Sequence, residues 1–69
     1  MSKAVAETAA TRIVAARKRL KLSRFAFAKR CGVSYTTAWR WEKGQCEPRD
    51  VRPIARALGV TVAEIRGEE

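Results

Sequence analysis

The chain has 69 residues, 46% of them hydrophobic, which allows one small domain near the lower limit at which a hydrophobic core alone can hold a fold. Fifteen basic against seven acidic residues give a charge of +8, which favours a polyanionic partner without separating DNA from RNA or an anionic membrane surface. Short apolar runs argue against a transmembrane span or signal peptide, and two cysteines without histidine argue against a disulfide framework or a zinc site.

The first clear helical pattern runs from 11 to 20. Its apolar stripe predicts a buried face, and the residues on that stripe are Ile13, Ala16, Arg17 and Leu20. Basic residues gather toward the C-terminal end of this helix, where cations suit the helix dipole, and they fit a solvated face as well as phosphate contacts. Residues 1–10 contain several alanines, which are strong helix formers, so we expect an N-terminal arm or an extension of this helix.

Between 24 and 43 the sequence predicts a short helix, a tight turn and a second helix. The buried positions of the first helix are spaced by three and four residues, and they are Phe27, Ala28 and Cys31. Gly32 supplies the turn, because a residue without Cβ enters left-handed backbone space at little steric cost. Ser23 and Ser34 are placed as N-caps, whose hydroxyls accept hydrogen bonds from the free amides that start each helix.

The second of these helices has two different faces. The face expected to be buried carries Thr37, Ala38 and Trp41. The other face is polar, aromatic and basic, and it carries Tyr35, Thr36, Trp39, Arg40 and Lys43. A helix that buries one side and presents such a surface on the other is suited to reading the DNA major groove. The pattern therefore indicates a DNA-binding helix-turn-helix.

A loop and a fourth helix follow. The sequence GQCEP at 44–48 is typical of a loop, and the next helix is predicted from about Arg49 to Leu58. Asp50 is expected to be its N-cap, and Pro53 falls in its first turn, where the missing amide would have had no partner. Its apolar stripe consists of Val51, Ile54, Ala55 and Leu58.

A last short helix ends the predicted domain. Thr61 and Glu64 form a capping box in front of its apolar residues, and a tail follows at 67–69. No stretch alternates apolar and polar residues in the way a half-buried strand would. We therefore predict an all-α protein, a compact bundle of five helices in one domain at 11–66.

Several short motifs occur in the order and spacing of one known family. They are Arg17, Leu22-Ser23, Phe27-Ala28, Gly32-Val33-Ser34, Trp41-Glu42-Lys43-Gly44, Pro48 and Leu58-Gly59-Val60. With these motifs, the run from about Ile13 to Ile65 resembles the Cro and phage-repressor (XRE-like) type of helix-turn-helix, which implies a lambda-repressor-like DNA-binding domain. Each motif alone is weak, but the complete series extends over most of the chain.

The resemblance implies roles for individual residues. Arg17 and Glu42 would form a structural ion pair between the first and third helices. The positions expected to contact bases are Tyr35, Thr36, Trp39 and Arg40. The positions expected to contact phosphates are Arg24, Ser34, Lys43 and Gln45, together with the loop amides after Gly44. Arg40 is the sharpest candidate, because a guanidinium can bind O6 and N7 of guanine together.

Three positions depart from the family pattern. Arg24 stands where the family usually has a glutamine that touches a phosphate. Trp39 stands where a small or polar residue is common, so it lies either against DNA or against a neighbouring subunit. Phe25 is apolar at a position that is normally polar and exposed, and with Trp39 it can mark an interaction surface.

These features predict a small transcriptional regulator that binds double-stranded DNA, in the manner of a Cro-like or prophage repressor. One module buries too little surface for tight selective binding, so we expect a homodimer on a two-fold operator, formed in solution or only on DNA. The alternatives are an antitoxin-type module that also binds a protein partner, and a general nucleic-acid binder driven by charge. An enzyme is not expected. We also expect a reduced, cytoplasmic protein with no metal, other cofactor, membrane partner or small-molecule ligand.

Overall fold

Five helices make up the regular structure of residues 8–67, the part of the chain that the computed structural model describes. They are α1 (Ala9–Arg19), α2 (Arg24–Cys31), α3 (Tyr35–Lys43), α4 (Arg52–Leu58) and α5 (Val62–Arg66). No strand occurs in this range, so the prediction of an all-α, five-helix fold is confirmed. Most of the predicted arm at 1–10, and the last two residues of the predicted tail, lie outside the described residues.

Hydroxyl side chains cap four of these helices. Ser23, Ser34 and Thr61 each accept a hydrogen bond from the amide three residues further on, at 3.0, 3.1 and 3.1 Å, as predicted. Thr8 forms an unpredicted capping box with Thr11, so α1 begins two residues before the predicted start at 11. Replacing a cap of this kind by alanine typically costs about 1 kcal/mol, and the caps therefore fix where the helices start.

The start of α4 differs from the prediction. The N-cap position is occupied by Val51 and not by Asp50, and no side chain caps the helix. Asp50 lies one residue earlier, where its carboxylate accepts the Arg52 amide at 3.0 Å and pairs with the Arg52 guanidinium at 2.9 Å. The helix consequently begins at Arg52, later than the predicted Arg49, with Pro53 in its first turn as predicted.

The core is formed by one stripe from each helix. Its largest fully buried side chains are Phe27, Ile13, Ile54, Leu58 and Ile65. Trp41 is only half-buried, but its ring packs edge-on against Phe27 with the centroids 6.4 Å apart. Leu20 was expected on the buried stripe of the first helix, yet it is 46% exposed. The reason is that α1 ends at Arg19, so Leu20 is the C-cap and leaves the helical register.

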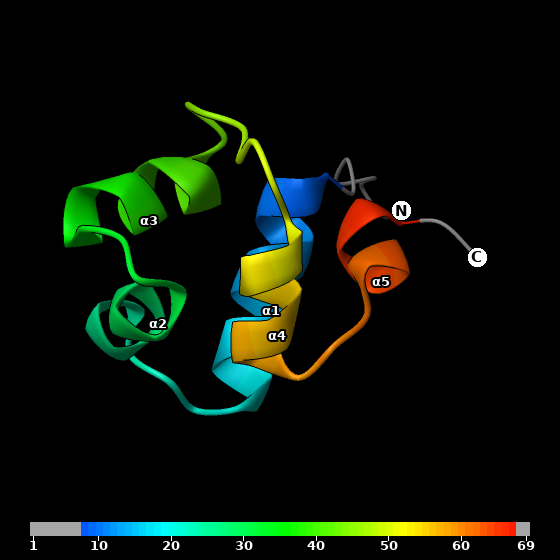
Figure 1. The fold of residues 1–69 in the computed structure, drawn as a ribbon, viewed down its shortest axis with the longest axis horizontal. Helices are drawn as coiled ribbons and strands as arrows, with labels where there is room; N and C mark the ends of the chain where they lie inside the picture. Colours follow the sequence, from blue (N-terminus) through cyan, green and yellow to red (C-terminus); the bar gives the residue numbers. More distant parts are fainter. Residues whose placement is uncertain (1–7, 68–69) are drawn as a thin grey trace, which may run out of the picture.

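The helices are arranged around α1 and α4, which contact each other in the middle of the molecule (Figure 1). On one side, α2 packs on α4 and on α3, and α3 also packs on α1. On the other side, α5 packs on both α1 and α4. Among the described residues no helix is long and apolar enough to cross a membrane. This arrangement leaves the outer face of α3 uncovered at one end of the molecule (Figure 1).

Candidate nucleic-acid interface

The turn between α2 and α3 sets the angle at which α3 is presented. Gly32 ends α2 in left-handed backbone space, with φ 75°, which is strained for any residue that carries a Cβ. The amide of Val33 then bonds back to the carbonyl of Ala28 at 3.0 Å. Ser34 follows at once as the N-cap of α3. The reversal therefore takes only three residues, and it holds α3 close against α2.

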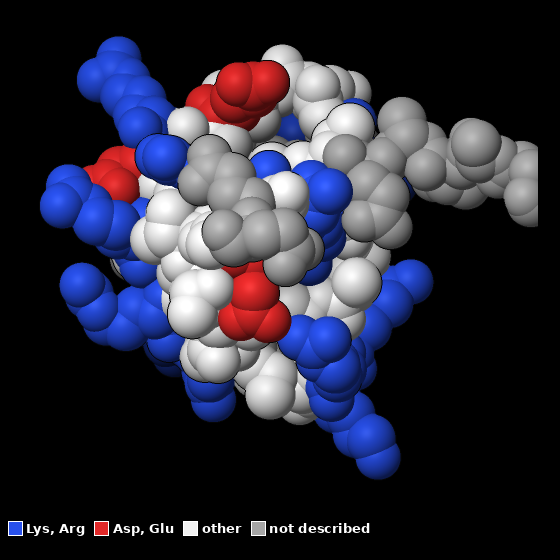
Figure 2. Space-filling view, turned by 90° about the vertical axis from the view of Figure 1, so that its right-hand side faces the viewer, with Lys and Arg blue, Asp and Glu red and all other residues white. Residues whose placement is uncertain are grey.

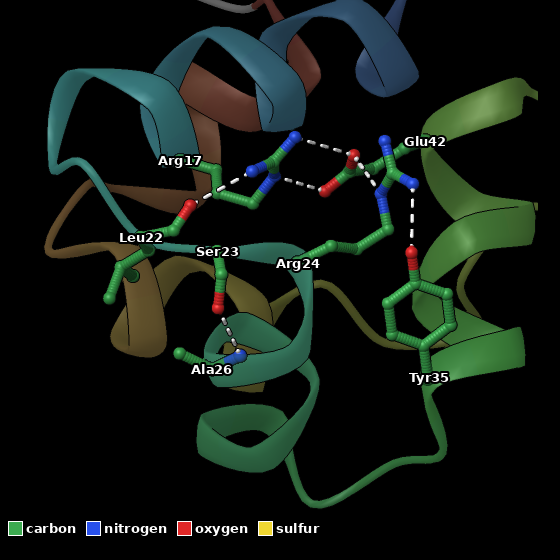
Figure 3. A network of polar contacts seen from close by, with 7 residues as sticks. All are labelled: Arg17, Leu22, Ser23, Arg24, Ala26, Tyr35 and Glu42. Atoms are coloured by element: carbon green, nitrogen blue, oxygen red, sulfur yellow. Dashed lines mark hydrogen bonds and ion pairs between the residues drawn. The ribbon is translucent and has the colours of Figure 1, made fainter.

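The carboxylate of Glu42, near the end of α3, is bound by two arginines (Figure 3). Arg17 of α1 donates from Nε to Oε2 at 2.7 Å and from Nη2 to Oε1 at 3.1 Å. Arg24, the first residue of α2, donates from Nε to Oε1 at 2.9 Å. The side chain of Glu42 is 1% exposed, against 9% for Arg17 and 25% for Arg24. The ion pair implied by the family resemblance is thus present, and Arg24 forms a second ion pair with the same carboxylate.

This network joins three helices and one loop. A third nitrogen of Arg17, Nη1, donates to the carbonyl of Leu22 at 2.8 Å, just before α2 begins. A buried carboxylate is costly unless its oxygens are paired and hydrogen-bonded, and both Glu42 oxygens are. Within residues 8–67 no buried side-chain nitrogen or oxygen lacks a hydrogen-bond partner. The network therefore fixes the start of α2 and the end of α3 relative to α1.

Arg24 also contacts the first residue of α3. Its Nη1 donates to the hydroxyl of Tyr35 at 3.2 Å, and its guanidinium carbon lies 5.9 Å from the Tyr35 ring centroid. The hydrogen bonds to Glu42 and then to Tyr35 raise the pKa of Arg24 above its ordinary value. The family resemblance made Arg24 a phosphate contact, whereas its guanidinium is engaged inside the protein here. Sequence reasoning did not find this link between Arg24 and Tyr35.

The rest of the outer face of α3 is open to solvent. Thr36, Arg40 and Lys43 are exposed, and Trp39 is half-buried. The Nζ of Lys43 lies 5.8 Å from the Trp39 ring centroid, so this cation rests over the aromatic face. Within the described part of the chain the Arg40 side chain makes no hydrogen bond or ion pair, in contrast to Arg24. The base-contact candidates therefore lie on one surface, and the Arg40 side chain on it is exposed.

Two of the residues predicted to contact phosphates, Ser34 and Gln45, already make hydrogen bonds within the protein. The hydroxyl of Ser34 accepts the Thr37 amide and lies 3.0 Å from the Thr37 hydroxyl. The backbone amide of Gln45 bonds to the carbonyl of Arg40 at 3.0 Å, closing the end of α3. The first of the loop amides after Gly44, which were expected to contact a phosphate, is therefore already hydrogen-bonded within the protein. The side chain of Gln45 remains exposed.

An apolar groove runs beside the start of α3. Its volume is about 240 Å³, and it is lined by Phe25, Ala28, Lys29, Val33, Ser34 and Tyr35. Phe25 is 66% exposed and Tyr35 is 45% exposed, which makes them two of the three large hydrophobic side chains that face solvent among the described residues. Phe25 is thus the surface aromatic that the sequence predicted, while Trp39 lies on α3 and does not line this groove.

Positive charge is not confined to the side of the molecule that carries α3. Figure 2 views the α5 side, away from α3, and lysine and arginine side chains project from both edges of it. The charge of +8 therefore does not by itself mark a binding face. No group of three or more histidine, cysteine or acidic side chains that could hold a metal ion is present in the described part of the chain. The polar, aromatic and basic side chains on the outer face of α3 are therefore a better guide to a nucleic-acid interface than the net charge of the chain.

Known proteins of the same architecture were found by sequence and by structure. A family model described as a helix-turn-helix domain matches residues 9–66. The P22 c2 repressor, solved in complex with a synthetic operator, has TM-score 0.85 and 27% identity, over 93% of this chain and 100% of that chain. The solution structure of the DNA-binding domain of the P22 c2 repressor has TM-score 0.83 and 28% identity, over 93% and 88%. No curated protein sequence matches the chain.

Proposed function

This chain belongs to the helix-turn-helix domain family, of the phage-repressor type, and we propose that it binds double-stranded DNA sequence-specifically as a small transcriptional repressor. The observation that carries this proposal is the close match to the P22 c2 repressor, which was solved on a synthetic operator. The open polar and basic face of α3 supports the same function. We propose that the protein acts in the cytoplasm of a bacterial cell.

In this proposal α3 enters the major groove of the DNA. Arg40 binds a guanine through O6 and N7, because its side chain is exposed and its guanidinium has no hydrogen bond or ion pair within the described residues. Thr36, Tyr35 and Trp39 contact neighbouring base edges. The phosphate contacts come from Lys43 and from the side chains of Ser34 and Gln45, which flank α3 at its two ends.

The functional form is a dimer on a two-fold site. A single module of this size buries too little surface for tight and selective binding, and two modules read half-sites about one helical turn apart. We propose that α4 and α5 provide the contact between the two copies. Sedimentation of the free protein and of its complex with a two-site duplex tests this. A stoichiometry of one protein per duplex would contradict it.

Selection of binding sites from random duplex DNA at near-physiological salt tests the function. We expect a two-fold symmetric motif, and we expect Arg40→Ala to lose preference at one base position in each half-site, by about 1–3 kcal/mol. Arg19→Ala is the matched control, because it removes the same charge from an exposed position on α1, and it should leave the base preference unchanged. If no motif is enriched and binding simply fades with salt, charge-driven binding replaces the proposal.

A second candidate function is supported by the exposed Phe25 and the apolar groove beside it. An exposed apolar patch often marks a protein contact, and an antitoxin-type module would hold a toxin there while α3 binds DNA. Co-expression with the protein encoded next to this one tests the idea. A complex that Phe25→Asp disrupts while DNA binding persists would favour it. A failure to co-purify would remove it.

A further inference from the structure

Arg24 already has two partners inside the protein, although a cation at the start of α2 is well placed for a phosphate. Its Nε is held by Glu42 at 2.9 Å, and its Nη1 donates to the Tyr35 hydroxyl at 3.2 Å. Glu42 is itself fixed by Arg17, and its side chain is 1% exposed. Arg24 therefore extends the buried ion network to a side chain on the molecular surface (Figure 3).

The contact also sets the polarity of the Tyr35 hydroxyl. A guanidinium has only hydrogen-bond donors, so the Tyr35 oxygen must be the acceptor in this contact. The hydroxyl proton is then available to a partner other than Arg24. Tyr35 is the first residue of α3 and is 45% exposed, at the edge of the face proposed to meet DNA. The geometry thus presents Tyr35 to the outside as a donor.

We propose that Arg24 is a specificity-determining positioning residue, which holds Tyr35 as a hydrogen-bond donor to an acceptor on a base edge in the major groove. This inference rests on the proposed function. Purine N7, guanine O6 and thymine O4 are acceptors in that groove, whereas cytosine presents the N4 donor. Tyr35 accordingly favours a purine or a thymine at the base it contacts and discriminates against cytosine. Arg24 acts through Tyr35 and not by binding a phosphate.

Two substitutions separate this role from a phosphate contact. Arg24→Lys keeps the positive charge but lacks the planar fork that reaches Glu42 and Tyr35 together. Tyr35→Phe keeps the ring and removes only the hydroxyl. Lys43→Gln is the reference for a lost phosphate contact. Because Arg17 still pairs with Glu42 in all three variants, we expect them to fold, and thermal unfolding by circular dichroism verifies this before binding is measured.

The measurement is a binding competition between two duplexes, the selected operator and the same duplex with cytosine at one base. That base is the position at which Tyr35→Phe loses the preference shown by the wild type. We expect wild-type discrimination of about fivefold, the value of one hydrogen bond, to be lost in Tyr35→Phe and in Arg24→Lys alike. The double variant should lose no more than either single one. The slope of log affinity against log salt should fall by about 0.9 in Lys43→Gln and stay unchanged in Arg24→Gln, which removes the cation at position 24.

Two results would overturn the proposal. One is an Arg24→Lys protein that still discriminates like the wild type while Arg24→Gln lowers the salt slope by about 0.9, which is the behaviour of a phosphate contact. The other is losses in Arg24→Lys and Tyr35→Phe that add together or fall at different base positions. A wild-type protein that selects no motif at all defeats the proposed function first, and the inference with it. That failure is seen before any variant is made.

Discussion

Replacing Glu42 by glutamine is expected to destabilise the domain strongly, although the shape of the side chain is kept. The change leaves two guanidinium groups beside a neutral amide whose side chain is 1% exposed. Breaking a buried ion pair by removing one partner costs about 3–5 kcal/mol. Arg24 is 25% exposed and can turn toward water, whereas Arg17 is 9% exposed and cannot. We therefore expect a loss near the lower end of that range, about 3 kcal/mol.

A loss of this size removes much of the stability that a domain of this length has, about 3–10 kcal/mol. The assay is urea unfolding followed by far-UV circular dichroism. Glu47→Gln is the matched control, because it makes the same chemical change at an exposed loop position and should stay within about 0.5 kcal/mol of the wild type. A Glu42→Gln protein that loses less than about 1 kcal/mol would refute the reasoning that the arginines depend on a buried anion.

Three further predictions concern single residues. The Arg52 guanidinium lowers the pKa of Asp50 to about 2, so the ionised Asp50 contributes to stability above about pH 4, and this contribution is lost as the pH falls through 2. Over that pH range the melting temperature of Asp50→Asn should therefore fall less than that of the wild type. Burial raises the pKa of the Cys31 thiol to about 11, so iodoacetamide at pH 8 should alkylate the exposed Cys46 before Cys31. Mass spectrometry follows the two alkylation rates, and equal rates would contradict the prediction. Ser34→Ala should cost about 1 kcal/mol in urea unfolding and Ser34→Gly only a few tenths, and the reverse order would be inconsistent with capping.

The helices and their core could be predicted because local rules decide them. Ser23, Ser34 and Thr61 cap their helices, since each hydroxyl needs only the amide three residues further on. The apolar spacing of 51–58 likewise led directly to the buried stripe of α4. Thr8 was missed because the box that it forms contains Thr11 instead of the glutamate or glutamine that marks such a box in a sequence.

The candidate site could be predicted only in part, because its decisive contacts join residues far apart in the chain. Local spacing placed Tyr35, Thr36 and Arg40 on one face of a helix, but it could not show that Arg24 reaches both Glu42 and Tyr35. Those pairs are 18 and 11 residues apart, and no periodic pattern links them. The prediction that Leu20 is buried was wrong for a related reason. Leu20 lies one residue past the end of α1, where the helical period no longer determines which way a side chain points.

The ion network around Glu42 determines which residues of this region can be substituted without loss of the fold. Thr36 and Arg40 are exposed on α3 without side-chain hydrogen bonds to the described part of the chain, so substitutions there change the outer face of α3 at little cost to folding. Glu42 has no such freedom, because Arg17 and Arg24 both depend on it. Arg24 lies between these two cases. Without it Arg17 still pairs with Glu42, while the Nε contact to Glu42 and the contact to Tyr35 are lost. If Tyr35 contacts a base as proposed, a substitution of Arg24 should therefore change recognition while the fold persists.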